Sequence, residues 1–186
     1  MRIITGMAKG MVLVAPRGAD VRPTSDRVRE AIFSSLGERV VNADVLDLYA
    51  GTGALGLEAA SRGARSVVFI EKARPSLAAI EKNLANFAKN RGVACAFAVV
   101  RGDVLRELSR LDRQFSLIFA DPPYAINPVP VLREVYDRQV LAPGGVLVLE
   151  TSKRAVLAAG WPGELEREAV YGETRVCHFR AARVGD

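Results

Sequence analysis

The chain contains 186 residues, of which 49% are apolar and 25% are charged, and its formal net charge is +5. This length predicts one globular domain with a sizeable core, and no apolar run approaches the ~18 residues needed to cross a bilayer. Glycines and a lysine interrupt the N-terminal stretch MRIITGMAKG, so it is not a signal peptide and we expect a cytoplasmic protein. Cys95 and Cys177 match no metal spacing, and we expect neither a disulfide nor a bound metal.

Residues 1–40 are predicted to form a basic appendage on a main domain that spans 41–186. The appendage is expected to contain a short hairpin over 2–15 and a helix near 25–37. Residues 1–29 carry six Lys or Arg side chains against two Asp side chains. Such an excess is typical of a surface that contacts a polyanion, and a solvated surface is the plainer alternative.

The helix of the appendage has clear start signals and one apolar face. It is preceded by Pro23, Thr24 and Ser25, and Thr or Ser side chains commonly cap the first turn of a helix. Its apolar face is formed by Val28, Ala31, Ile32 and Leu36. Arg27 and Arg29 are therefore expected to point away from the core.

Strand and helix patterns alternate from residue 43 onward. The expected strands are apolar runs at 43–50, 66–71, 94–100, 115–120 and 144–150. Helices are expected at 54–63, from Pro75 to near Gly92, and at 129–140. In the tail, 164–182, two strand-like runs about Tyr171-Gly172-Glu173 predict an antiparallel hairpin.

Near-continuous apolar strands that alternate with helices indicate a mostly parallel sheet covered on both faces. Five such strands and the C-terminal antiparallel hairpin give a seven-stranded sheet. The predicted fold class is α/β and Rossmann-like, with helices on both faces and the N-terminal hairpin and helix beside them.

A glycine-rich stretch, DLYAGTGALG (47–56), joins the first expected strand to a helix. Gly51 and Gly53 allow a tight turn and a close approach to a ligand, and Gly56 allows the helix to pack close to the sheet. The pattern is G-x-G-x-x-G, and Glu71 ends the next strand at the spacing of a ribose-binding carboxylate. An NAD-dependent oxidoreductase is therefore one interpretation.

Two further acids favour S-adenosylmethionine over a dinucleotide as the ligand. Asp47 precedes the first glycine and could meet the cationic ammonium group of a methionine moiety, whereas it would repel a pyrophosphate. Asp103 follows the third strand, where a carboxylate can accept a hydrogen bond from an adenine amino group. Together with Glu71, these acids would line one crevice at the switch point of the sheet. Each one alone could instead be a helix N-cap.

The fourth expected strand ends in Asp-Pro-Pro-Tyr, residues 121–124. In a doubly wound sheet this strand neighbours the first, so its exit faces the same crevice. The Asp121 carboxylate and the Pro122 carbonyl could accept hydrogens from the exocyclic amine of a nucleobase, and Tyr124 could stack on that base. Methyl transfer would then need orientation and electrostatics, and no metal. The alternative is a structural turn.

The motifs DLYAGTGALGLEA, FIEK, GDV and DPPY resemble those of class I S-adenosylmethionine-dependent methyltransferases. RPTSDRVREAIF and YGETR are more particular, and with them residues 1–180 resemble the RsmD family. Members of that family methylate the N2 amine of one guanosine in bacterial small-subunit ribosomal RNA.

The resemblance implies three sets of functional residues. The implied donor contacts are Asp47, Tyr49, Ala50, Gly51, Gly53, Glu71, Lys72, Asp103 and Val104. The implied site for the reacting amine consists of Asp121, Pro122 and Tyr124. The implied RNA contacts are Lys9, Arg22, Thr24, Arg27 and Arg29. The expected partner is small-subunit ribosomal RNA or the 30S particle. We expect the protein to be a monomer and not to bind a membrane.

Some features depart from this picture or are expected to serve the fold. The N-terminal hairpin carries only Lys9 and is less basic than is usual in the family. His178, the only histidine, and Trp161, the only tryptophan, are predicted to be structural. An adenine-N6 methyltransferase, an NAD-dependent oxidoreductase and a non-catalytic RNA-binding assembly factor stay open as alternatives.

Overall fold

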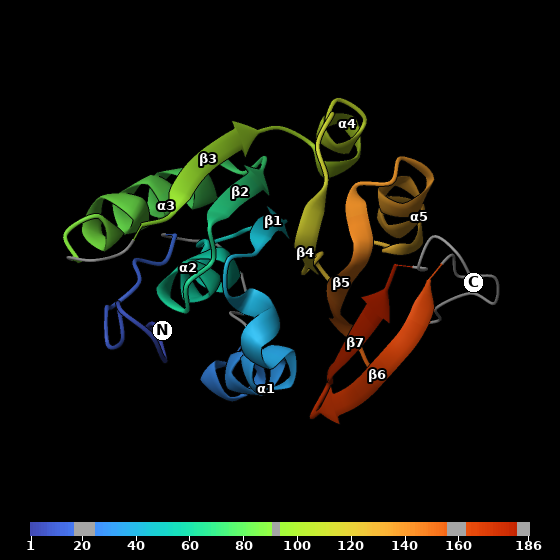
Figure 1. Cartoon of the computed structure of the whole chain (residues 1–186), viewed down its shortest axis with the longest axis horizontal. Coiled ribbons are helices and arrows are strands. Elements are labelled where there is room, and N and C mark those ends of the chain that lie inside the picture. Colours follow the sequence, from blue (N-terminus) through green and yellow to red (C-terminus); the bar gives the residue numbers. More distant parts are fainter. Residues whose placement is uncertain (17–24, 91–93, 156–162, 182–186) are drawn as a thin grey trace.

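The structure, a computed structural model, describes residues 1–16, 25–90, 94–155 and 163–181. Its centre is a seven-stranded sheet with the order β3-β2-β1-β4-β5-β7-β6 (Figure 1). The first five strands are parallel, and β7 pairs antiparallel with both β5 and β6. The bounds are β1 Asp44–Leu48, β2 Ser66–Glu71, β3 Ala96–Arg101, β4 Phe115–Ala120, β5 Leu141–Ser152, β6 Glu164–Tyr171 and β7 Thr174–Arg180. The predicted Rossmann-like arrangement with a C-terminal hairpin is confirmed.

Helices cover both faces of the sheet. Their bounds are α1 Asp26–Leu36, α2 Ala54–Ser61, α3 Arg74–Phe87, α4 Val104–Leu108 and α5 Val129–Asp137, with a 3-10 turn at Gly37–Val40. One apolar cluster joins α1, α2 and α3 to one sheet face, and a second joins α4 and α5 to the other. No helix in the described ranges is both long and apolar enough to span a bilayer.

Alternation along the strands decides which helices each side chain meets. Val45 of β1, Phe119 of β4 and Val148 of β5 belong to the cluster beneath α1 and α2. The ring of Phe33 in α1 lies 5.5 Å from that of Phe119, centroid to centroid. The N-terminal appendage therefore shares its core with the sheet. Along β3, at the edge of the sheet, however, most side chains are exposed or half-buried. The predicted cover of helices on both faces therefore does not extend to this strand.

The predicted strands 66–71 and 115–120 have the observed bounds of β2 and β4. Strand β5 is longer than predicted and begins before its glycines, at Leu141, with an irregular register against β4. Helix α3 contains Pro75 in its first turn, as predicted. The five-residue helix α4 was not predicted, because it is too short to show a period. Gly92 and Trp161 lie outside the described residues.

The expected N-terminal hairpin is present as a short pairing around one antiparallel bridge between Arg2 and Val12, in which the amide of Ile3 donates to the Met11 carbonyl at 2.9 Å. Other backbone amides of the segment donate to α2. The amide of Ala8 donates to Ser61 Oγ at 2.9 Å, and the amide of Met7 donates to the Ser61 carbonyl at 2.8 Å. The segment therefore combines hydrogen bonds between its own two arms with contacts that attach it to the main domain.

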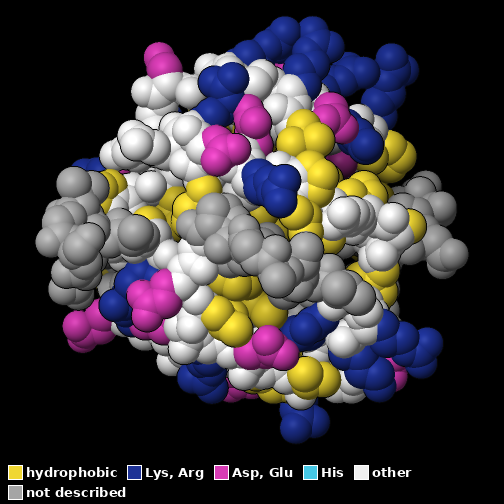
Figure 2. Space-filling model, turned by 90° about the vertical axis from the view of Figure 1, so that its right-hand side faces the viewer, with side chains coloured by type: hydrophobic (Ala, Val, Ile, Leu, Met, Phe, Trp, Pro, Cys, Tyr) yellow, Lys and Arg dark blue, Asp and Glu magenta, His cyan; other side chains and the backbone are white. Residues whose placement is uncertain are grey.

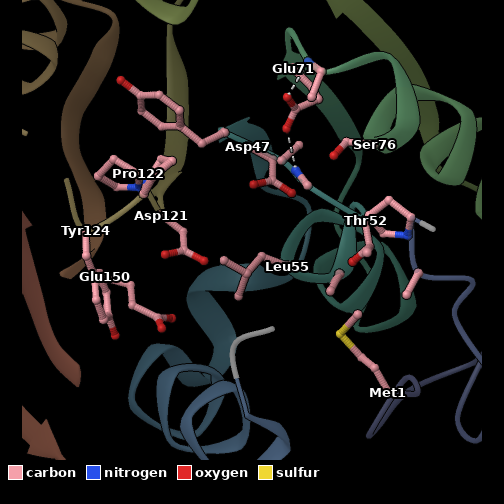
Figure 3. A pocket seen from close by; sticks show the side chains of 18 of the residues that line it. Met1, Asp47, Thr52, Leu55, Glu71, Ser76, Asp121, Pro122, Tyr124 and Glu150 are labelled. Atoms are coloured by element: carbon pink, nitrogen blue, oxygen red, sulfur yellow. Dashed lines mark hydrogen bonds between the residues drawn. The ribbon is translucent and has the colours of Figure 1, made fainter. Parts of the chain in front are cut away.

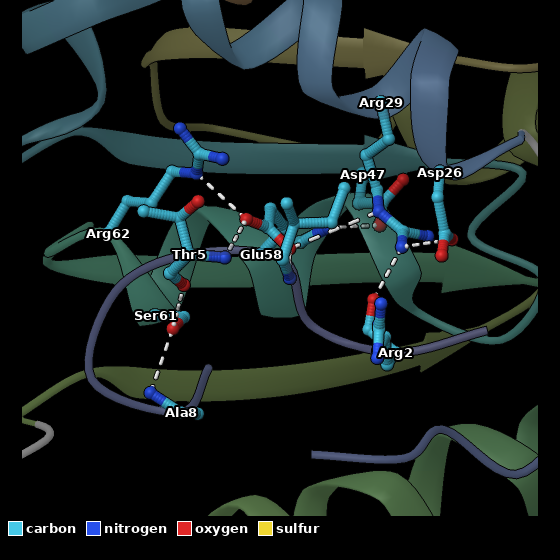
Figure 4. Close-up of polar contacts among 11 residues, drawn as sticks. Arg2, Thr5, Ala8, Asp26, Arg29, Asp47, Glu58, Ser61 and Arg62 are labelled. Carbon is cyan, nitrogen blue, oxygen red and sulfur yellow. Dashed lines mark hydrogen bonds and ion pairs between the residues drawn. The ribbon is translucent and has the colours of Figure 1, made fainter. Parts of the chain in front are cut away.

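Glu58 of α2 is the centre of this attachment (Figure 4). Its carboxylate accepts hydrogen bonds from the amides of Ile4 at 2.7 Å and Thr5 at 3.0 Å. Arg62 Nε donates to the same carboxylate at 2.8 Å, and Arg29 Nε lies 4.0 Å from it. A buried carboxylate is tolerated when charges and donors surround it in this way.

Arg29 is buried, which corrects the prediction that it points away from the core and contacts RNA. Its side chain is 0% exposed, and it donates to Asp26 and to the Arg2 carbonyl. Burial lowers its pKa, while Asp26 and Glu58 oppose that effect. Position 29 lies three and four residues before Ile32 and Phe33, on the stripe of the helix that faces the core.

We predict that Glu58→Ala lowers the free energy of unfolding by about 3–5 kcal/mol, because it leaves the Arg62 guanidinium and two backbone amides without their acceptor and removes the buried negative charge 4.0 Å from Arg29. Arg29→Met should cost less, since Glu58 keeps Arg62 and both amides. Urea unfolding measures both losses. Glu81→Ala, on the exposed side of α3, is the control. Equal losses for Glu58→Ala and Glu81→Ala would contradict this account of the attachment.

Candidate active site

A cavity of about 650 Å³ lies at the C-terminal ends of the parallel strands (Figure 3). The loops after β1, β2 and β4 line it, together with the end of β5. The N-terminal segment closes one side through Met1 and Leu13, and the β6–β7 hairpin contributes Tyr171 and Thr174. This is the edge at which an open α/β sheet binds its ligands.

The loop after β1 is fixed in a left-handed conformation. Gly51 has φ 57°, and the preceding Tyr49 also has a positive φ of 59°. The Gly51 amide donates to Glu71 Oε2 at 2.9 Å, so the loop is attached to the end of β2. Both residues and the intervening Ala50 line the cavity. Positive φ at a residue other than glycine is uncommon and concentrates at functional sites.

Gly56 lets α2 lie against the sheet. A Cβ atom at this position would stand 2.4 Å from the Phe69 ring and 2.7 Å from Val67. Its amide donates to Asp47 Oδ2 at 2.9 Å. Because Gly56 has no side chain, α2 approaches β1 closely enough to donate this hydrogen bond to Asp47, near the end of the strand.

Asp47 is 1% exposed and lines the cavity. Burial raises its pKa to about 8, and the charge of Glu71 adds to this effect, while the hydrogen bond from Gly56 opposes it. A cationic group placed in the cavity would favour the charged carboxylate. Asp47 is therefore placed to meet a cationic group such as the ammonium group of S-adenosylmethionine.

Glu71 is held by three backbone amides. Besides Gly51, the amides of Lys72 and Ala73 donate to its Oε1, each at 2.8 Å. A carboxylate oxygen can accept two hydrogen bonds, so Oε2 keeps one position for a ligand hydroxyl. Because Glu71 lines the cavity, this fixed acceptor fits the ribose of the donor.

The structure brings most, but not all, of the predicted donor contacts to the cavity. Lys72 and Val104 line it. The lining contributed by the described residues does not include Asp103 or Gly53. Asp103 caps α4 by accepting from the Leu105 amide at 3.2 Å, and it lies 3.4 Å from Lys72 Nζ. Asp103 is therefore a helix N-cap, which was the alternative interpretation to a donor contact.

The exit of β4 faces the cavity from the other side (Figure 3). The amide of Asp121 continues the ladder to β1 by donating to the Leu48 carbonyl at 3.5 Å. Pro122 is buried, whereas Tyr124 is 44% exposed. The Tyr124 hydroxyl lies 2.7 Å from Thr174 Oγ1 on the C-terminal hairpin. The Asp-Pro-Pro-Tyr segment and the glycine loop thus line one cavity.

The lining residues that were not predicted include three polar ones near the β4 exit: Glu150, Tyr171 and Thr174. Glu150 ends the apolar part of β5, and its carboxylate lies on the same side of the pocket as Asp121 (Figure 3). An acid at the end of a parallel strand is the signal that had identified Asp47 and Glu71. The same signal was available for Glu150.

The structure describes only some of the residues that were predicted to contact RNA. Arg22 and Thr24 lie outside the described residues, while Lys9 and Arg27 are exposed. Arg27 lines a smaller hollow of about 310 Å³, which shares Tyr171 with the main cavity. On the face shown in Figure 2, Lys and Arg gather near the upper and lower margins, with hydrophobic side chains between them.

His178 and the two cysteines lie apart from this chemistry. The His178 ring is buried in β7, where Nε2 lies 2.7 Å from Ser35 Oγ, and burial lowers its pKa to about 4. Its neutral, packed ring agrees with a structural role. Cys95 and Cys177 are both free thiols, as expected.

The order of the strands and the cavity at their C-terminal ends define the Rossmann-like fold of class I methyltransferases. The family model described as "Conserved hypothetical protein 95" matches residues 1–180. The chain therefore belongs to this family, the RsmD family, which its sequence motifs resemble.

Relatives and solved structures agree with this membership. Ribosomal RNA small subunit methyltransferase D of Escherichia coli strain K12 is 33% identical over 93% of this chain and 86% of its own length. A solved structure named "Putative methyltransferase yhhF from Escherichia coli" is 32% identical, covers 98% of both chains and has a TM-score of 0.84. A hypothetical protein of Thermus thermophilus is 31% identical, with a TM-score of 0.77 over 96% of this chain and 98% of its own.

We predict that Asp47→Asn changes how stability depends on pH. The folded-state pKa of Asp47 lies above its ordinary value of 3.8, so folding takes up a proton. The stability that this group contributes is complete below pH ~3.8 and is lost as the pH rises to about 8, by up to ~1.4 kcal/mol per pH unit. Asp47→Asn should remove this slope and be the more stable protein at pH 8. Urea unfolding at pH 6 and pH 8 tests it, and identical slopes would contradict the burial effect.

Proposed function

We propose that this protein transfers a methyl group from S-adenosylmethionine to the exocyclic N2 amine of a guanosine in small-subunit ribosomal RNA, on an assembled or assembling 30S particle. One observation carries the proposal. A single cavity is lined by the acid-and-glycine loop suited to the donor and by Asp121, Pro122 and Tyr124, which suit a base amine. The name of the Escherichia coli relative supports ribosomal RNA as the substrate.

The donor would lie along the ends of β1 and β2. Asp47 would accept from its ammonium group, and Glu71 would accept from its ribose hydroxyls. Lys72 and Val104 also line the cavity, and the adenine would be held against them. When bound, the donor supplies a methyl group made electrophilic by the adjacent sulfonium.

An exocyclic amine is a weak nucleophile, because its lone pair is delocalised into the ring. Acceptance of its two hydrogens by the Asp121 carboxylate and the Pro122 carbonyl would localise that lone pair and direct it at the methyl group. Two consecutive prolines fix two φ angles, so this carbonyl is held in position. Tyr124, anchored through its hydroxyl to Thr174, would stack on the base.

The rival functions differ in what they require of these residues. Adenine-N6 methylation would use the same Asp-Pro-Pro-Tyr chemistry and is the nearest alternative. A nicotinamide dinucleotide would bring a pyrophosphate toward Asp47 and would leave the β4 exit without a role. An assembly factor without activity would not need buried acids beside the glycine loop.

We expect the purified protein to transfer labelled methyl groups to unmodified small-subunit particles, and nuclease digestion with mass spectrometry to identify N2-methylguanosine. Asp121→Ala should lower turnover by about 10²-fold or more and leave donor affinity unchanged in calorimetry, because it removes an acceptor aimed at the reacting amine. Asp137→Ala, at the exposed end of α5, is the matched control. N6-methyladenosine as the product would replace this proposal with its nearest rival, and tight NADH binding without donor binding would overturn both.

The exposed cations of the appendage are proposed to contact RNA phosphates. Arg27→Ala should weaken RNA binding and reduce the slope of log affinity against log salt by about one, because one phosphate contact is lost. The control is Arg133→Ala on the exposed side of α5. Filter binding at several salt concentrations measures the slope. An Arg27→Ala slope equal to that of Arg133→Ala would remove Arg27 from the interface.

A further inference from the structure

The acid near the end of β5, Glu150, is placed beside the proposed amine site by the register of the sheet. Ala120 of β4 pairs with Leu149 of β5, so the next residues, Asp121 just beyond β4 and Glu150 within β5, lie side by side. Both line the cavity, and their carboxylates lie on the same side of it (Figure 3). Tyr124 reaches the same corner.

The alternation of side chains explains why these acids face the same way. In β5, Val146 and Val148 pack in the cluster beneath α1 and α2, and Glu150 is the next residue on that side. Asp121 follows Phe119 in β4 by the same spacing. Two neighbouring apolar rows therefore end in carboxylates at the edge of the sheet.

Glu150 is only 6% exposed. Its backbone pairs with Val176 of β7, a buried apolar residue. Keeping a carboxylate at a position that continues an apolar row costs desolvation energy, and an apolar residue would fit the row better. Buried acids that line a cavity concentrate at functional sites.

We propose that Glu150 is a specificity-determining residue that accepts the N1–H of guanine; this inference rests on the proposed function. With the N2 amine held by Asp121 and Pro122, the neighbouring atom on the same edge of guanine is the N1–H donor. Adenine presents an N1 lone pair at that place, which a carboxylate repels. The second carboxylate therefore selects guanine over adenine through attraction to one base and repulsion of the other.

The test uses small-subunit RNA in which the methylated nucleotide is either guanosine or 2-aminopurine riboside. Both bases carry the N2 amine, but only guanine has a hydrogen on N1. The wild-type protein should prefer guanosine by about 10²-fold or more in kcat/KM. Glu150→Gln should reduce this preference to less than about tenfold, because a glutamine amide can donate to N1. Effects of the missing O6 atom are common to both proteins and cancel in the comparison.

Glu164→Gln, on the exposed side of β6, should keep the wild-type preference. Glu150→Gln should also keep the wild-type donor affinity, which shows that the cavity is intact. If Glu150→Gln does not fold, Glu150→Asp tests the same point. It withdraws the carboxylate by one methylene and should lower guanosine turnover by about tenfold or more at unchanged donor affinity.

The outcomes separate this inference from the proposed function. An active wild-type protein whose guanosine preference is unchanged in Glu150→Gln, or whose turnover is unchanged in Glu150→Asp, overturns the role of Glu150 alone. A wild-type protein that methylates no guanosine in small-subunit RNA overturns the proposed function and this inference with it.

Discussion

The parallel pairing of β1 with β4 is the constraint on which the site depends. Its register joins Leu48 to Ala120, so the glycine loop and Asp121 leave adjacent strands at the same edge. Strands β2 and β3 extend the sheet on one side of this pair, and β5 extends it on the other. The loops after β1 and β4 therefore diverge and leave a crevice between them. The strand order alone brings the proposed donor site and amine site together.

The apolar rows of the sheet end in acids at this edge, and this has an energetic consequence. Asp47 shows the cost directly, because burial raises its pKa to about 8. The N-terminal segment lines the same cavity through Met1 and Leu13. Asn83 of α3 joins that segment to the glycine loop, since its amide donates to the carbonyls of Val14 at 3.1 Å and Thr52 at 2.9 Å. The appendage thus completes the site as well as extending the surface.

The sequence predicted best what depends on continuous apolar runs. Strands β2 and β4 were bounded correctly because polar or charged residues flank their apolar runs. The adjacency of β1 and β4 followed from the alternation of strands and helices. Arg29 was misplaced because an arginine was assumed to avoid the core. Its buried partner, Glu58, lies on a different helix, and a single sequence does not reveal such a pairing.

The site was predicted where residue type and strand end coincide, at Asp47, Glu71 and Asp121. Glu150 was missed because the fifth strand was interpreted only as part of the core. The N-terminal hairpin was predicted, but its attachment to the main domain was not. Some of its backbone hydrogen bonds go to Glu58 and Ser61 of α2, and these tertiary contacts leave no local signal.

A crystal structure of the protein with S-adenosylhomocysteine and a guanosine-containing fragment of small-subunit RNA would test the central claim most directly. The account predicts that the ammonium group of the cofactor lies at Asp47 and that the base stacks on Tyr124. The N2 atom should contact both Asp121 and the Pro122 carbonyl and point at the sulfur. A base bound outside this cavity, or a cofactor that avoids the glycine loop, would contradict it.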